Sequence, residues 1–100
     1  SIMERGIDTT GYSSITFEYY RKLIGLDSAD EFKVKWFDGS SWNVLEQTGS
    51  NSASDANYVL KSFVLPGNAG NNVNFKVRFE CTAGAVSEFC RVDNVRVVGE

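Results

Sequence analysis

VNFKVRFECTAGAVSEFCRVDNVRVV, residues 73–98, is the stretch that decides the fold of this chain. Its first half alternates between apolar and polar residues from Val73 to Cys81, and its second half returns with a similar apolar spacing. A period of two indicates strands with one buried face and one solvated face. The segment TAGAVSEF turns the chain between them. We therefore expect strands over 73–81 and 90–98 that pair as an antiparallel hairpin.

Cys81 and Cys90 lie at the mouth of the expected hairpin loop. If the two strands pair, the sulfurs face each other, and a disulfide between them stabilises the fold by about 3 kcal/mol. The alternative is a pair of reduced, buried cysteines that pack as small hydrophobes. A zinc site is not expected, because two thiols in a chain without histidine leave the metal shell half empty. A disulfide predicts an extracellular or cell-surface location.

The composition is that of a chain that can fold, but it offers few residues suited to catalysis. One hundred residues, 42% hydrophobic and 13% aromatic, suffice for one domain, which we expect to span residues 1–100 and to be cut from a longer secreted or surface protein. The net charge of -3 leaves no basic patch, so we expect neither nucleic acid nor an anionic membrane as a partner. No apolar run is long enough to insert into a membrane. Without histidine or a carboxylate pair in an apolar setting, we expect no enzyme.

Strand patterns separated by turn residues recur along the whole chain. Besides the two strands above, they cover Ile2–Ile7, Ser14–Lys22, Glu31–Phe37, Trp42–Gln47 and Tyr58–Leu65. About seven to eight such strands predict an all-β, antiparallel β-sandwich with immunoglobulin-like or jelly-roll connectivity. No sustained helical period occurs, and the only helical candidates are short turns within 23–30 or 54–57.

The last strand breaks its own alternation at Asp93-Asn94, where one extra residue separates Val92 from Val95. A β-bulge absorbs such a residue and redirects the side chains around it. One interpretation is that Asp93 and Asn94 bond a neighbouring loop or the N-terminal strand. The other is a Ca²⁺ site, because calcium takes carboxylate, amide and carbonyl oxygens. Glu4 or Asp8 would then supply a second ligand from the N-terminal segment.

Two aromatic residues are candidates for ligand contact. In the hairpin WFDGSSW, residues 36–42, Asp38 can accept bonds within its own turn and Gly39 can supply a positive φ. Trp42 is then either part of a purely structural turn or a platform on which a sugar ring stacks. Tyr20 falls on the solvated side of its strand, and an exposed tyrosine offers the same kind of platform.

The order IDTTGYSSITFEYYRK, FKVKWFDGSSWNVL and LPGNAGNNVNFKVRFECTAGAVSEFCRVDNVRVVG resembles the jelly-roll accessory domains of secreted microbial proteins. Their architecture is similar to that of carbohydrate-binding modules, with a galactose-binding-like sandwich, and to the MAM domain of animal surface proteins. In related carbohydrate-binding jelly rolls, the aspartate of the closing strand binds a structural calcium beside the N-terminal strand. The resemblance implies this role for Asp93, with Glu4 as the nearest candidate for a second ligand.

These observations leave three functions open. The first is a noncatalytic extracellular binding or adhesion module, with carbohydrate as the expected ligand and Tyr20 and Trp42 as its contacts. The second is a structural spacer or folding-support domain of a surface protein or protease. The third is a protein–protein module of the MAM type, which would display a contiguous apolar patch.

Overall fold

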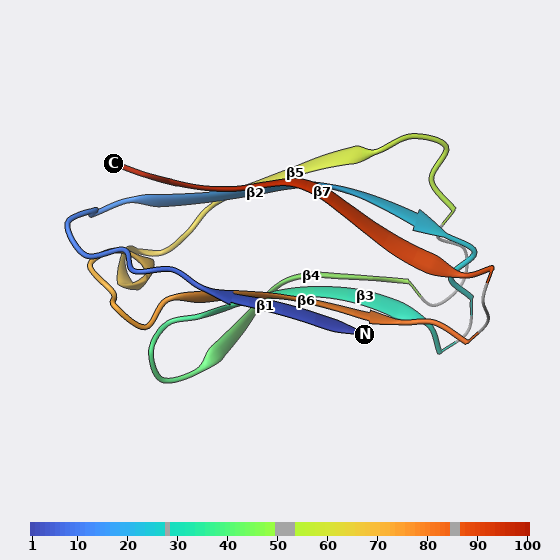
Figure 1. Cartoon of the computed structure of the whole chain (residues 1–100), viewed down its shortest axis with the longest axis horizontal. Helices are drawn as coiled ribbons and strands as arrows, with labels where there is room; N and C mark the ends of the chain where they lie inside the picture. Colours follow the sequence, from blue (N-terminus) through green and yellow to red (C-terminus); the bar gives the residue numbers. More distant parts are fainter. Residues whose placement is uncertain (28, 50–53, 85–86) are drawn as a thin grey trace.

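The computed structural model describes residues 1–27, 29–49, 54–84 and 87–100, and within them it shows a sandwich of two antiparallel sheets (Figure 1). The four-stranded sheet has the order β1-β6-β3-β4 and the three-stranded sheet the order β5-β2-β7. The strands are β1 (Ile2–Gly6), β2 (Ile15–Ile24), β3 (Glu31–Phe37), β4 (Trp42–Gly49), β5 (Val59–Val64), β6 (Lys76–Thr82) and β7 (Phe89–Gly99). The predicted all-β sandwich is confirmed, with seven strands in the described residues.

The expected hairpin between the last two strands is wrong. β6 pairs with β1 and β3 in one sheet, whereas β7 pairs with β2 in the other. The chain crosses between sheets at every connection except the one from β3 to β4. Alternation identifies the buried face of a strand but says nothing about its neighbours. β6 and β7 do bury their apolar faces together, but across the core and not side by side (Figure 1).

The core forms where the predicted apolar faces of β2 and β7 in one sheet meet those of β3 and β6 in the other. Buried residues alternate with partly exposed ones along β2 and β3, as the sequence indicates. Phe79 on β6 is central, because its ring lies 5.9 Å from the ring of Phe17 and 5.2 Å from that of Tyr19. Each buried side chain of this size contributes about 1.5–3 kcal/mol. Trp36 is the tryptophan of the core, with 3% of its surface exposed.

The predicted disulfide is confirmed, and it joins the two expected strands, although these lie in different sheets and do not form a hairpin. Cys81 is the penultimate residue of β6 in one sheet, Cys90 is the second residue of β7 in the other, and their Cα atoms lie 6.1 Å apart. The bond therefore connects the two sheets at one end of the sandwich. Because disulfides persist where the surroundings are oxidising, this bond indicates an oxidising location.

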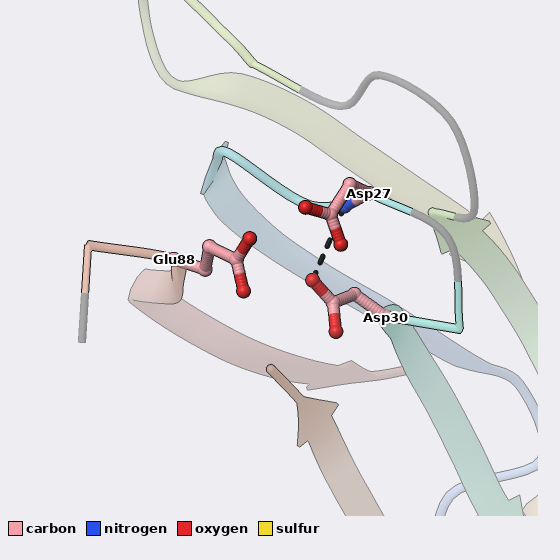
Figure 2. A group of neighbouring side chains, drawn as sticks. All are labelled: Asp27, Asp30 and Glu88. Atoms are coloured by element: carbon pink, nitrogen blue, oxygen red, sulfur yellow. Dashed lines mark hydrogen bonds between the residues drawn. The ribbon is translucent and has the colours of Figure 1, made fainter. Parts of the chain in front are cut away.

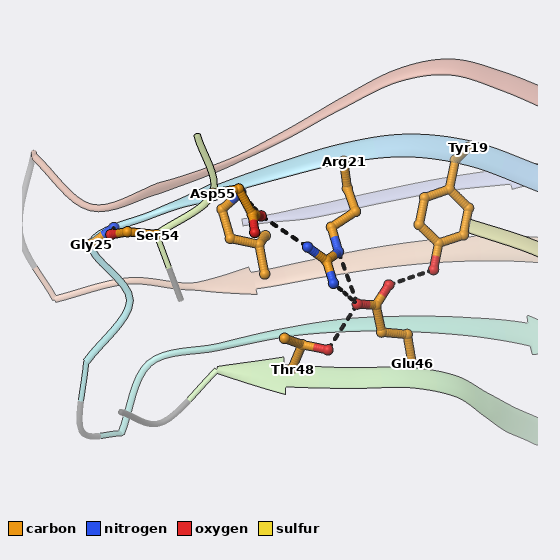
Figure 3. A network of polar contacts seen from close by, with 8 residues as sticks. Tyr19, Arg21, Gly25, Glu46, Thr48, Ser54 and Asp55 are labelled. Carbon is orange, nitrogen blue, oxygen red and sulfur yellow. Dashed lines mark hydrogen bonds and ion pairs between the residues drawn. The ribbon is translucent and has the colours of Figure 1, made fainter. Parts of the chain in front are cut away.

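A buried polar network joins the two sheets near the same end (Figure 3). Glu46 of β4 accepts hydrogen bonds from the Tyr19 hydroxyl at 2.6 Å and from Arg21 Nε at 2.9 Å. Arg21 Nη1 also pairs with Asp55 at 2.8 Å, and Thr48 donates to Glu46 at 2.7 Å. Burial and the neighbouring Glu46 carboxylate raise the pKa of Tyr19, so its hydroxyl keeps its proton. Every charge in this network has a partner.

Residues 54–55 fasten the connection from β4 to β5 onto β2. The backbone N–H of Asp55 donates to Leu23 O at 2.8 Å, and Leu23 N donates back to the Asp55 carboxylate at 2.9 Å. Gly25 N donates to the Ser54 hydroxyl at 2.9 Å. These bonds fix the start of the loop from β2 to β3, which carries the carboxylates described below.

The turn between β3 and β4 forms as the sequence predicts. One carboxylate oxygen of Asp38 accepts the backbone N–H groups of Ser40 and Ser41, both at 2.9 Å, and Gly39 has a φ of 104°. These hydrogen bonds hold the pKa of Asp38 well below its usual range. Asn43 adds a side-chain bond at 3.2 Å.

Two local expectations are corrected at the opposite end. Val73, expected inside a strand, is 65% exposed in a turn, because Asn72 Oδ1 accepts the N–H of Asn74 and β6 starts only at Lys76. The described residues contain a single short helix, a 3₁₀ turn at Gly67–Ala69. It lies outside both segments that the sequence marked as helical, and it follows Pro66, whose fixed φ suits the start of such a turn.

Candidate functional site

Tyr20 occupies the centre of the outer face of the three-stranded sheet. Its Cα partners are Leu60 on β5 and Asp93 on β7, so the three side chains form one row across the sheet. Tyr20 is 37% exposed and Leu60 is 50% exposed. Opposed residues on one face have Cβ atoms about 4.5–5.5 Å apart, close enough to contact one ligand together. We call this row, Leu60–Tyr20–Asp93, the tyrosine row.

The predicted bulge places Asp93 in this row. Between Glu18 and Tyr20 on β2 the register of β7 shifts, because Arg96 opposes Glu18 while Asp93 opposes Tyr20. Asn94 takes up the extra residue with a φ of 50°. Its backbone N–H donates to Asp93 Oδ1 at 2.8 Å. The exposed Asp93 carboxylate therefore lies beside the aromatic ring that the sequence selected independently.

Trp42 lies on the outer face of the four-stranded sheet, opposite Phe37 of β3. Its ring is half-buried, and the guanidinium carbon of Arg78 lies 4.4 Å from the ring centroid. Arg78 is itself held by Glu4 at 2.8 Å and by Glu80 at 3.2 Å. A sugar could stack on that side of Trp42 only after displacing Arg78, so Tyr20 is the better-placed aromatic residue.

Glu4 lies on β1, at the open side of the sandwich. It lines a cavity of about 560 Å³ between the β1 and β7 edges, together with apolar residues that include Met3, Phe79 and Val95. The N-terminal strand lies near the bulged part of β7, but the side chains of Glu4 and Asp93 lie on the outer faces of opposite sheets. The carboxylate of Glu4 is occupied by Arg78, and Asp93 lies in the other sheet. A role for both residues as metal ligands stays a prediction.

Three other carboxylates converge at the disulfide end of the sandwich (Figure 2). Asp27 and Asp30 come from the loop between β2 and β3, and Glu88 directly precedes β7. One oxygen from each of the three lies within 4.8 Å of the others. Asp30 is only 4% exposed. We call Asp27, Asp30 and Glu88 the carboxylate cluster.

Backbone contacts shape the carboxylate cluster. Asp27 N donates to Asp30 Oδ2 at 3.2 Å, and Asp30 N returns a bond to Asp27 O at 3.0 Å. On the other side, Gly84 N donates to Glu88 Oε1 at 3.0 Å. The two loops approach closely at Gly25, whose φ is 68° and where a Cβ would lie 3.3 Å from Glu88 Cγ. The fold therefore holds Glu88 against the two aspartates.

The electrostatics of the carboxylate cluster favour a cation. Contact with the Asp27 carboxyl, burial and the Asp30 carboxyl raise the pKa of Glu88. The backbone N–H of Asp27 lowers the pKa of Asp30. No lysine or arginine among the described residues forms an ion pair with any of the three, and the seven remaining residues of the sequence are uncharged. Carboxylate oxygens that converge in this way can hold a metal ion such as Ca²⁺.

Sequence reasoning missed the carboxylate cluster. Its only local signal is the pair Asp27 and Asp30 in the charged loop GLDSAD. Glu88 lies 58 positions after Asp30, and the pairing of β7 with β2, which sets Phe89 opposite Ile24, brings it there.

Comparison with known proteins leaves the chain without a family assignment: no family model, no curated protein and no solved structure matches it. Within the described residues, no helix has both the length and the apolar character needed to cross a membrane.

Proposed function

We propose that this protein is a noncatalytic extracellular binding module that takes carbohydrate on the outer face of its three-stranded sheet. The tyrosine row is the observation that carries the proposal. An exposed ring at Tyr20 offers an apolar surface to the C–H face of a sugar, and the Asp93 carboxylate beside it accepts hydrogen bonds from hydroxyl groups. The Cys81–Cys90 disulfide supports an extracellular location.

The architecture supports a place among the jelly-roll accessory domains that the sequence resembles. The chain alternates between two antiparallel sheets at five of its six connections, as jelly rolls do. A site on an open sheet face is shallow, so we expect modest affinity for a single sugar chain. Tandem copies in a longer polypeptide would raise the apparent affinity by avidity.

Replacing Tyr20 with alanine should weaken glycan binding about fivefold, because the aromatic contact is worth about 1 kcal/mol. The measurement is a glycan-array screen of the full chain, followed by titration of each hit. Tyr20→Phe should retain most of the affinity, since the ring remains. Trp42→Ala is the matched control on the other sheet and should bind normally. An array without hits, or hits that weaken only with Trp42→Ala, would refute the proposed site.

A second candidate function is protein contact of the MAM type on the same face. Val64 and Val98 flank Thr16 in one row of the sheet and are 76% and 37% exposed. Together with Leu60 they add apolar surface to the face of Tyr20. A domain that binds no glycan and forms a dimer sensitive to Val64→Lys would favour this function.

We also propose that the carboxylate cluster holds a structural Ca²⁺. Glu88 and the two aspartates supply oxygens from two loops, and backbone carbonyls or water can complete the six to eight that calcium takes. A bound ion would offset the mutual repulsion of the three carboxylates. Such a site would tie the β2–β3 loop to the start of β7, beside the disulfide.

Added Ca²⁺ should raise the melting temperature, and chelation should lower it. At one hundred times Kd, binding to the folded state alone stabilises by about 2.7 kcal/mol. Glu88→Gln should abolish the response, whereas Asp93→Asn, the matched change at the site predicted from sequence, should preserve it. Loss of the response in Asp93→Asn but not in Glu88→Gln would place the calcium at Asp93. A melting temperature that does not change with calcium would exclude both sites.

The folding stability of the metal-free protein should also depend on pH through Glu88. Its pKa in the folded state lies above the ordinary 4.5, so its contribution to stability is complete below that value and is lost as the pH rises through the raised pKa. In chelator, Glu88→Gln should flatten this loss. Differential scanning calorimetry over the acid range measures it.

A further inference from the structure

The outer face of the three-stranded sheet carries two cations directly opposite each other. Lys22 on β2 and Arg91 on β7 are Cα partners, and both belong to the same face as Tyr20. Like charges in this position destabilise an antiparallel pair. Neither residue forms an ion pair among the described residues, and the seven remaining residues include no acid.

Each of the other cations on the outer faces of the two sheets contacts a carboxylate or an aromatic ring. Four of them have a carboxylate within 3.4 Å: Lys33, Lys35, Arg78 and Arg96. The remaining one, Lys76, lies over the ring of Phe37. Arg5 on β1 and Lys61 on β5 also form no ion pair among the described residues, but each lies on the core-facing side of an edge strand. Arg91 has such a ring as well, since its guanidinium carbon lies 4.7 Å from the centroid of Phe89. That contact holds Arg91 in place, but it leaves two positive charges side by side without a counter-ion.

This cationic pair continues the tyrosine row. Lys22 follows Tyr20 by two residues on β2, and Arg91 precedes Asp93 by two on β7, so the rows are about 6.6 Å apart. That spacing lies within reach of a single bound sugar. Glu18, the other acid on this face, is occupied by Ser62 at 2.8 Å and by Arg96 at 3.4 Å. The net charge of Lys22, Arg91 and Asp93 is therefore +1, next to an exposed aromatic ring.

We propose that Lys22 and Arg91 form an anion subsite and that the carbohydrate bound by this face is acidic. The sugar ring lies against Tyr20, and its carboxylate or sulfate enters between the two cations. The planar guanidinium of Arg91 suits two parallel hydrogen bonds to such a group, and the ammonium of Lys22 adds a point charge. This inference rests on the function proposed above and specifies its ligand class.

The test is a glycan array in which uronic-acid and sulfated oligosaccharides are printed beside their neutral counterparts. We expect the acidic member of a pair to bind at least tenfold more tightly, with a difference that shrinks as salt is added. The variant K22M/R91M should abolish the difference and keep the weaker neutral binding. Lys76→Met, which removes a cation from the other sheet, should change nothing. The carboxylate and sulfate arms identify which acid is bound.

The outcomes separate the two proposals. Hits that bind acidic and neutral members equally would overturn the anion subsite and leave the carbohydrate module standing. An array without hits would overturn both. Acidic hits that survive Tyr20→Ala at full strength but vanish in K22M/R91M would support the cationic pair and refute stacking as the basis of the site.

Discussion

Replacing Arg21 with methionine is expected to remove about 3–5 kcal/mol of folding free energy. Arg21 is 8% exposed and is the only cation that pairs with Glu46 and Asp55 in the described residues. Without it, the Glu46 carboxylate stays buried at 6% exposure with no counter-charge. Methionine has a similar length, so the loss reflects charge more than packing. Urea denaturation of the variant and the parent measures it.

A double variant separates the effect of the unpaired Glu46 charge from the effect of altered packing. Replacing Glu46 by leucine in the Arg21→Met background removes the stranded carboxylate, and we expect it to recover part of the lost stability. The Tyr19 hydroxyl then loses its acceptor, so recovery should be incomplete. If Arg21→Met alone costs less than about 1 kcal/mol, the network behaves as a solvated surface pair, and its role in joining the sheets is refuted.

Replacing both cysteines by alanine should lower the stability by about 3 kcal/mol. Part of the reason is the freedom that the unfolded chain regains when Cys81 and Cys90 are no longer joined. The structure adds a local consequence, because the bond holds the end of β6 to the start of β7 next to Glu88. The double variant should therefore also lose calcium affinity. Chemical denaturation gives the first effect and calcium titration the second.

Reduction of the parent protein is the matched control for that experiment. After reduction and alkylation, its stability should fall to that of the variant without cysteines. Counting the alkylated thiols should give two per chain. If the double variant denatures at the same urea concentration as the parent, the disulfide does not contribute to stability. If its calcium affinity is unchanged, the β6–β7 connection does not position Glu88.

The sequence predicted those features that depend on the character of one strand. The alternation of Phe17 and Tyr19 with polar neighbours places β2 in the core, and the extra residue at Asn94 produces the predicted bulge. The Asp38 turn is equally local, because its acceptors and donors lie within five residues. Period and turn chemistry suffice for such features.

The sequence could not indicate which strands lie next to one another in each sheet. Nothing in the alternation of residues 73–98 distinguishes a hairpin from two strands that face each other across a core, because both arrangements bury the same side chains. The cysteines fit both arrangements. The contact of Glu88 with Asp27 and Asp30, and the opposition of Lys22 to Arg91, depend on that choice. Both appear only once the two sheets are assembled.

The most direct test of the proposed binding face is a two-dimensional ¹H–¹⁵N NMR titration of the full chain with the strongest glycan from the array. If this face binds glycan, the shifted amides will cluster on β2, β5 and β7 around Tyr20, Leu60 and Asp93, and Tyr20→Ala will suppress the shifts. Shifts confined to the four-stranded sheet around Trp42, or no shifts with any acidic or neutral glycan, would contradict it.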